Sequence, residues 1–213
     1  MSHISLSSPG NKKIKREAST RERSKWIAKT GILTALSVIL MYLEFPIPLM
    51  PVFLKFDFAD LPALLASFSL GPLSGVIVQL LRNILHMPAS QTFYTGELAN
   101  FLVGGTFVLV AGLIYQRHKT KRSAILGMAL GGLTMTVVAV AFNYFINIPF
   151  YIKVMGLPLE GIIGMVNAAG NQLVHNLWTL LLFVFVPFNI FKSLVISGIM
   201  LLIYKKLSPL LHR

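Results

Sequence analysis

Polar side chains occur within apolar segments of this chain, where they are costly and where they could bind a ligand. In the stretch PFNIFK at 187–192, Asn189 and Lys192 stand three residues apart. That spacing puts an amide and an ammonium on one face of a helix. A charge costs about 2.5–3.5 kcal/mol at the centre of a membrane helix, so polar groups in such helices are candidates for function. We expect this pair to donate hydrogen bonds to carbonyl or hydroxyl oxygens of a ligand.

Lys192 also has an interpretation without a ligand. Its long side chain would then reach the membrane surface or pair with Glu97, while Asn189 would bond a neighbouring helix. Asn143, in the stretch FNYF, favours a ligand pocket, because Tyr144 and Phe145 offer aromatic surface beside another amide.

Three acidic residues have local interpretations. Asp57 and Asp60 come just before the apolar stretch LPALLA, which favours N-capping of a helix with Pro62 in its first turn. Glu97 follows YTG and is expected either to stabilise the start of its own helix or to contact a ligand. Arg82 has no role that the sequence resolves.

The composition identifies an integral membrane protein. Hydrophobic residues make up 55% of the 213 residues and charged residues only 12%, whereas soluble domains carry about 25% charged residues. The net charge of +12 comes from basic clusters that flank apolar segments, which is typical of membrane topology signals. We therefore expect the lipid bilayer as a partner, and no nucleic acid.

Several motifs of catalysis and metal binding are absent from the sequence. It has no cysteine, five scattered histidines, no P-loop motif and no credible pair of nucleophile and base. We predict no catalytic residues, no metal site and no cofactor. An intramembrane enzyme that uses Glu97 or His175 is a disfavoured alternative, and so is a stand-alone secondary transporter, because no inverted repeat is apparent.

The apolar pattern predicts an all-α protein with six membrane helices. A basic, disordered cytoplasmic tail is expected at 1–25, the membrane domain at 26–207 and a short cytoplasmic tail at 208–213. A proline-rich loop at 44–58 follows the first helix. The expected helices cover 26–43, 59–71, 72–86, 97–115, 124–147 and 187–204.

The 12-residue stretch at 175–186 is too short to cross a membrane and is interpreted as interfacial or re-entrant. Pro187 would then lie in the first turn of the last helix, where proline is tolerated. With six crossings, all basic clusters fall on one side, which the positive-inside rule makes cytoplasmic. A seventh crossing would place Lys205 and Lys206 outside. Both termini are therefore predicted to be cytoplasmic, and the intramembrane polar groups to gather in the outer half.

Four stretches together resemble a known family: the proline-rich loop leading into DFADLPALL, then GELANF, FNYF and PFNIFK. The chain is similar to the riboflavin-specific substrate-binding (S) components of energy-coupling factor (ECF) vitamin transporters, from about residue 26 to 207. The resemblance implies the six-helix S-component fold in a bacterial cytoplasmic membrane. It also implies that the chain binds riboflavin as transported ligand and performs no chemistry. An S component for another vitamin or modified base is the alternative.

The resemblance also implies roles for individual residues. Asn143, Asn189 and Lys192 would line the riboflavin site. Asn100 and the segment from Phe53 to Lys55 would complete it, and Glu97 is a further candidate from the sequence itself.

The same resemblance implies protein partners, namely a transmembrane coupling subunit and ABC-type ATPase subunits. Gly31 and Ala35 are small residues at helical spacing on the first helix, which lets another helix approach closely. These two residues are therefore expected to contact the coupling subunit.

Overall fold

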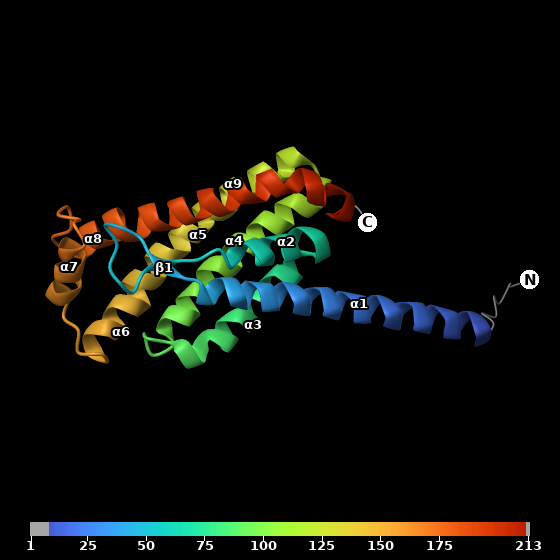
Figure 1. Cartoon of the computed structure of the whole chain (residues 1–213), viewed down its shortest axis with the longest axis horizontal. Coiled ribbons are helices and arrows are strands. Elements are labelled where there is room, and N and C mark those ends of the chain that lie inside the picture. The colour runs from blue at the N-terminus through green and yellow to red at the C-terminus, as the bar shows by residue number, and fades with distance from the viewer. Residues whose placement is uncertain (1–8, 212–213) are drawn as a thin grey trace, which may run out of the picture.

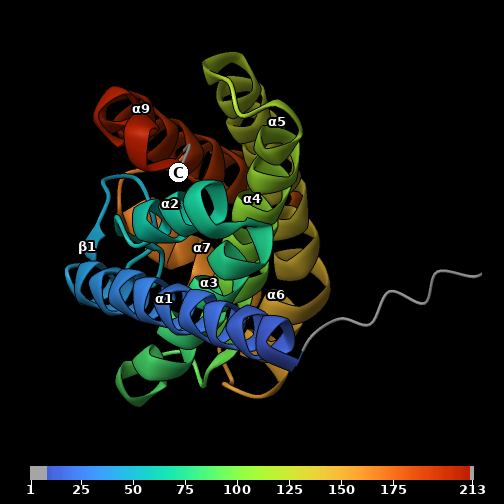
Figure 2. The same ribbon diagram turned by 90° about the vertical axis from the view of Figure 1, so that its right-hand side faces the viewer.

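A computed structural model describes residues 9–211 of the chain and shows long helices packed side by side (Figures 1 and 2). The first half of the chain contains α1 (Pro9–Tyr42), β1 (Phe45–Pro46), β2 (Lys55–Phe56), α2 (Asp60–Leu70), α3 (Pro72–His86), a 3₁₀ turn η1 (Met87–Ala89) and α4 (Thr95–His118). The second half contains α5 (Lys121–Phe142), η2 (Asn143–Asn147), α6 (Ile148–Lys153), α7 (Leu159–Ala168), α8 (Leu177–Leu180), η3 (Leu181–Phe185) and α9 (Val186–Leu211).

Four of the described helices are long and apolar enough to cross a membrane. They cover Thr20–Tyr42, Thr95–His118, Lys121–Lys153 and Leu177–Tyr204. The expected short helices α2 and α3 have 11 and 15 residues, fewer than the roughly 20 of a full crossing. Gly71, with φ +113°, and Pro72 at the start of α3 form the tight turn between them. Glycine tolerates that left-handed backbone, and proline suits the first turn of a helix.

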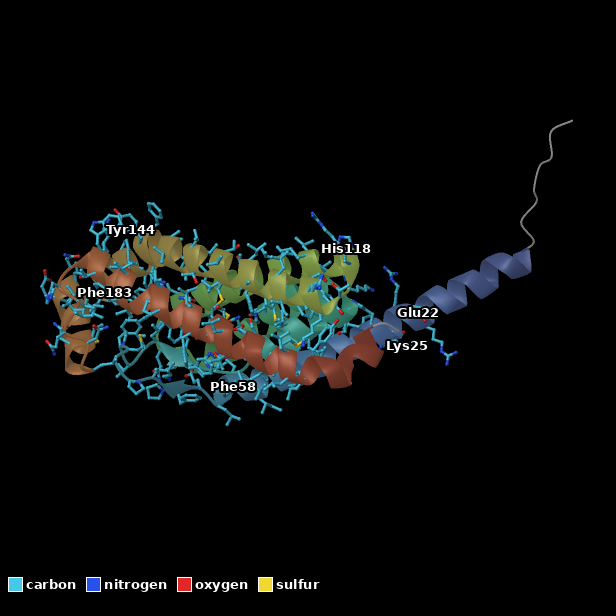
Figure 3. The ribbon with its side chains drawn as sticks, turned by 90° about the horizontal axis from the view of Figure 1, so that it is seen from above. Glu22, Lys25, Phe58, His118, Tyr144 and Phe183 are labelled. Carbon is cyan, nitrogen blue, oxygen red and sulfur yellow. The ribbon has the colours of Figure 1, made fainter. Side chains whose placement is uncertain are left out.

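The first helix starts earlier than the sequence predicted. Helix α1 begins at Pro9, so residues 9–25, expected to be disordered, are helical. The ends of α1 and α9 nearest the chain termini lie at the same end of the molecule (Figure 1). The α4–α5 connection is there too, since Figure 3 has His118 on the same side as Glu22 and Lys25.

The prediction that the last helix starts at Pro187 is wrong. One continuous helix runs from Leu177 to Tyr204 and includes the stretch that was expected to be interfacial. Pro187 has no N–H to donate, which would ordinarily break the helix. The π-helical segment η3 immediately precedes it, and the carbonyl of Phe183, four residues before the proline, accepts a hydrogen bond from Asn171 Nδ2 at 3.3 Å.

Helix α5 likewise continues through a π segment and a proline. It was expected to end at residue 147, but it continues through η2 and α6 to Lys153. Here too a π segment ends two residues before a proline, Pro149. Short π segments inside α-helices are rare and are frequent at functional sites.

Buried apolar side chains form two clusters. The bundle core joins α2, α3, α4, α5 and α9, and includes Phe68, Phe107, Tyr115 and Met135. The cap core joins α6, α7, α8 and η3, and the first loop, residues 44–58, packs on it through Met50, Phe53 and Leu54. Within the bundle core, α4 and α5 approach so closely that a Cβ at Gly127 would lie 2.6 Å from the carbonyl oxygen of Ala111.

Candidate functional site

A cavity lies between the bundle core and the cap core. Its walls come from the first loop, from α1, α3 and α4, and from the two continuous helices that contain π segments, Lys121–Lys153 and Leu177–Tyr204. These two are called the π-interrupted helices. All seven residues that the sequence predicted for a binding site line the cavity: Phe53, Lys55, Glu97, Asn100, Asn143, Asn189 and Lys192. Residues up to 139 positions apart in sequence (192 − 53) thus converge on one space.

The two amides at 143 and 189 lie at different places in the two π-interrupted helices, but each bonds the carbonyl four residues before it. Asn143 begins η2 and donates through Nδ2 to the carbonyl of Ala139 at 2.8 Å. Asn189 follows η3 and donates to the carbonyl of Phe185, also at 2.8 Å. These bonds to the backbone fix each amide plane, so that Oδ1 is presented as an acceptor. Asn147 Nδ2 occupies the acceptor of Asn143 at 3.1 Å, whereas Oδ1 of Asn189 has no partner among the described residues.

Lys192 neither reaches the membrane surface nor pairs with Glu97, so both ligand-free interpretations are wrong. It is only 4% exposed. Its Nζ donates to Asp57 Oδ2 at 3.0 Å and lies 3.1 Å from Asp60 Oδ2. The charge is therefore compensated inside the protein, by carboxylates from the first loop and the start of α2.

The capping interpretation of Asp60 is wrong as well. Ala59 is the N-cap of α2, and no side chain caps that helix. Asp57 does accept a hydrogen bond from the Ala59 N–H at 2.7 Å, which orders the chain before α2. Both carboxylates, however, face the cations, because two buried positive charges need neutralising partners.

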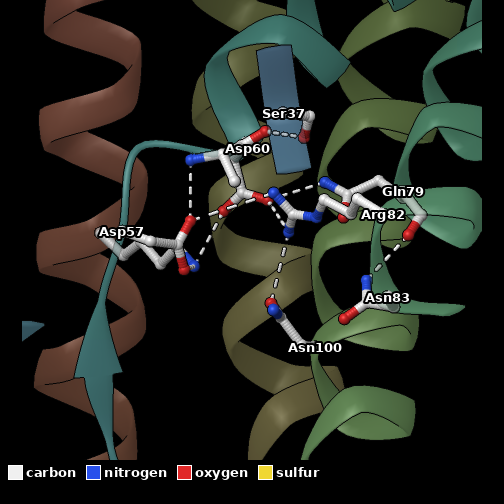
Figure 4. A network of polar contacts seen from close by, with 9 residues as sticks. Ser37, Asp57, Asp60, Gln79, Arg82, Asn83 and Asn100 are labelled. Carbon is white, nitrogen blue, oxygen red and sulfur yellow. Dashed lines mark hydrogen bonds and ion pairs between the residues drawn. The ribbon is translucent and has the colours of Figure 1, made fainter. Parts of the chain in front are cut away.

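Arg82, for which the sequence gave no role, is the second cation. It is fully buried, and its Nη2 donates to Asp60 Oδ1 at 2.6 Å and to Asn100 Oδ1 at 3.4 Å (Figure 4). Gln79 adds a 2.7 Å hydrogen bond to the same Asp60 oxygen. With its oxygen bound by Arg82, Asn100 keeps its Nδ2 donors for the cavity that it lines.

Glu97 has two partners of its own. His86 Nδ1 lies 3.2 Å from Oε1, and Ser90 donates to Oε2 at 2.7 Å. The first loop carries a separate ion pair, in which Lys55 Nζ lies 2.6 Å from Glu44 Oε1. The pairing of β1 with β2 brings these two residues together at the mouth of the loop.

The aromatic residues of the FNYF stretch do not form the walls that the sequence suggested. Phe145 is 71% exposed, and the ring of Tyr144 stacks on that of Trp178, with centroids 5.1 Å apart, away from the cavity. The predicted Phe53 does line the cavity, together with Tyr151, which sequence reasoning missed; their ring centroids lie 5.8 Å apart in an edge-on contact. Other lining residues that sequence reasoning missed are Met135, Phe185, Phe188, His86, Gln91 and Thr92.

Gly31 and Ala35 lie outside the cavity. Both are exposed on α1, beside the exposed apolar side chains Ile32, Leu36 and Ile39. A Cβ placed on Gly31 would meet no atom within 4 Å. This face of α1 is therefore open, while Thr30, Thr34 and Ser37 are buried on the other side, where Ser37 donates to the carbonyl of Ala59.

The fold and the cavity define a helical membrane protein with a partly open cavity between two packed cores. No group of three or more His, Asp or Glu side chains in residues 9–211 could hold a metal ion. The cavity instead combines apolar and aromatic walls with a few fixed polar groups, as small-molecule binding sites do.

Comparisons with known proteins agree with this class. Residues 25–204 match the family described as ECF transporter, substrate-specific component. The chain is 33% identical to the riboflavin transporter RibU of Staphylococcus aureus over 192 residues, 90% of this chain and 95% of that protein. It is 28% identical to the riboflavin transporter FmnP of Bacillus subtilis, covering 87% and 93% of the two chains.

A solved structure of the S component of a bacterial ECF transporter superposes with a TM-score of 0.69 at 34% identity. The match covers 90% of this chain and 99% of that one. The chain therefore belongs to the family of substrate-specific components of ECF transporters. It is a multi-pass bacterial membrane protein, and its relatives are transporter components rather than enzymes, as the sequence predicted.

Proposed function

We propose that the protein is a riboflavin-binding S component, which captures the vitamin for import driven by separate ATPase subunits. The observation that carries this proposal is the convergence of the seven predicted residues on one cavity. Curated relatives along most of the chain are riboflavin transporters. Riboflavin is uncharged and combines a flat tricyclic ring, a pyrimidine edge of donors and acceptors, and a polyhydroxyl chain. Such a ligand matches aromatic walls with amides and one ammonium.

The proposed roles follow from the position of each group. Asn143, Asn189 and Lys192, on the two π-interrupted helices, would hydrogen-bond the polar edge of the ring. Phe53 from the first loop would cover it. Lys55, Glu97 and Asn100 would meet the hydroxyl groups.

We further propose six membrane helices with both termini in the cytoplasm. The chain order gives six passes if α2 and α3 count as short ones and α8 to α9 as a single helix. The basic residues near Lys25 and His118 are then on the cytoplasmic side (Figure 3). The binding cavity would open toward the outer side, where the vitamin is captured.

The exposed face of α1 is proposed to contact a transmembrane coupling subunit, which would connect the protein to ABC-type ATPases. Gly31→Leu should fill the open space that Gly31 leaves and prevent close helix contact. We expect unchanged riboflavin affinity and reduced uptake in vesicles that hold the complete transporter. Normal uptake by this variant would exclude Gly31 from the docking face.

A titration of the purified full-length protein with riboflavin, followed by quenching of flavin fluorescence, tests the main proposal. Saturable one-to-one quenching is expected, and unlabelled riboflavin should displace bound flavin. Absence of quenching, with full binding of another vitamin in a competition series, would assign the cavity to that vitamin instead.

A further inference from the structure

Four buried charges adjoin the cavity and balance one another. Asp57 and Asp60 are 3% and 1% exposed, Arg82 is 0% exposed and Lys192 is 4% exposed. Lys192 contacts both carboxylates, and Arg82 contacts Asp60 directly and has Nη1 4.0 Å from Asp57. The four side chains come from the first loop, α2, α3 and α9, so the quartet joins four segments. Figure 4 labels three of them, Asp57, Asp60 and Arg82.

Only half of this quartet reaches the cavity. Asp57 and Lys192 line it, whereas Asp60 and Arg82 lie behind them. Asp60 therefore has no direct access to a ligand, and any effect that it has on binding must pass through a neighbour. Its nearest neighbour on the cavity side is the Lys192 ammonium.

The number of N–H donors on Lys192 determines what it can offer to a ligand. A lysine ammonium has three N–H donors. One is donated to Asp57, and the nitrogen is also held 3.1 Å from Asp60 Oδ2 by an ion pair. At least one donor is left for an acceptor in the cavity. Because both carboxylates hold the nitrogen, the direction of the remaining donor is determined by the protein.

The carboxylate of Asp60 is itself held in place. Both Arg82 and Gln79 donate to Oδ1, at 2.6 and 2.7 Å, which leaves Oδ2 to face Lys192. A carboxylate bound by two fixed donors cannot rotate away from the ammonium. The order of contacts is thus Arg82 and Gln79 to Asp60, Asp60 to Lys192, and Lys192 to the cavity.

We propose that Asp60, held by Arg82 and Gln79, is a positioning residue that aims the free N–H of Lys192 at an acceptor of the bound ligand. This inference rests on the proposed function and adds to it a residue outside the cavity. It explains why a fully buried arginine and aspartate lie side by side behind a binding site. Preorganised donors raise affinity because the ordering of the side chain does not have to occur on binding.

A double-mutant cycle tests the positioning role with riboflavin as the probe. Asp60→Asn keeps the shape of the side chain and removes the charge that holds Lys192. It should raise the Kd for riboflavin about tenfold in the otherwise native chain, a change that corresponds to about 1.4 kcal/mol. In the Lys192→Met background, the same change should alter the Kd less than about twofold, because contacting residues are coupled. A purely structural role would give the same effect in both backgrounds and would overturn the proposal.

Two further variants complete the experiment. Glu160→Gln, at an exposed position of α7, is the matched control for removal of a carboxylate and should leave the Kd unchanged. If Asp60→Asn leaves Arg82 uncompensated and the chain does not fold, Asp60→Asn combined with Arg82→Gln removes both charges together. This pair should again weaken riboflavin binding only when Lys192 is present, and an unchanged Kd would overturn the proposal. A native chain that binds no riboflavin would instead refute the proposed function.

Discussion

The bundle core and the cap core are built in different ways, although both are helical. In the bundle core, uninterrupted helices approach closely at small residues, as at Gly127 against Ala111. In the cap core, the helices contain π segments and prolines and alternate with loops. The cavity lies where the two meet. The comparison indicates that both halves supply walls of the cavity: the regular helix α4 contributes Glu97 and Asn100, and the interrupted helices contribute Asn143, Asn189 and Lys192.

The largest effect is expected at the boundary between the two halves. Lys192→Met leaves Asp57 and Asp60 without their shared cation, and breaking a buried ion pair costs about 3–5 kcal/mol of stability. The free energy of unfolding in detergent should fall by that amount, and riboflavin binding should weaken as well. If the free energy of unfolding and the affinity for riboflavin both stay native, Lys192 neither stabilises the fold nor contacts the ligand, and the prediction fails.

Gly127→Ala tests the bundle core. Its new methyl group would lie 2.6 Å from the Ala111 carbonyl oxygen, so the α4–α5 contact must widen. Overpacking of this kind costs about 1–3 kcal/mol, which denaturant unfolding can measure. The folded fraction should bind riboflavin with native affinity. Gly198→Ala is the matched control, since a Cβ there meets nothing within 4 Å.

Asn143→Ala tests the cap side of the cavity. It removes an amide that lines the cavity and leaves a ligand group unpaired, which should weaken riboflavin binding by about 1–3 kcal/mol. A fluorescence titration measures the change. For the comparison to hold, the affinity must fall more than it does in Gly127→Ala; equal affinities in the two variants would contradict it.

The smallest effect is expected at Asn171, which the sequence left without a role. Asn171→Ala removes the hydrogen bond to the Phe183 carbonyl that precedes Pro187, and also the one that Asn171 Oδ1 accepts from the Leu173 N–H. A net hydrogen bond contributes about 1 kcal/mol, so the unfolding temperature should fall slightly. Gln172→Ala is a control, because Gln172 is an exposed neighbour whose side chain bonds only the Asn167 carbonyl. Equal unfolding temperatures for the two variants would show that the bond to Phe183 adds nothing.

Local patterns in the sequence were sufficient to predict much of this structure. Apolar stretches predicted α2, α3 and α4 to within a few residues, and all seven residues predicted from intramembrane polar groups and from the family resemblance are among those that line the cavity. A resemblance over most of the chain supplied the expected ligand. These features depend on hydrophobic runs, on prolines and glycines, and on short motifs.

The features that were missed depend on contacts between distant segments. Lys192 and Asp57 are 135 positions apart, and no local spacing predicts that the loop carboxylate lies against the last helix. Arg82 could be interpreted only once Asp60 was placed beside it. The continuity of the last helix through Pro187 depends on η3 and on Asn171, and neither leaves a pattern in the apolar run.

The π segments also bear on how such a scaffold can diversify. A π turn accommodates one residue more than an α turn, and a single residue corresponds to about 100° of helical rotation. The side chains beyond η2 and η3 are therefore turned relative to an unbroken helix, while α5 before η2 keeps its packing in the bundle core. Gain or loss of one such insertion would change which residues face the cavity. Related chains could thus acquire pockets for other compounds without altering the packing of the bundle core.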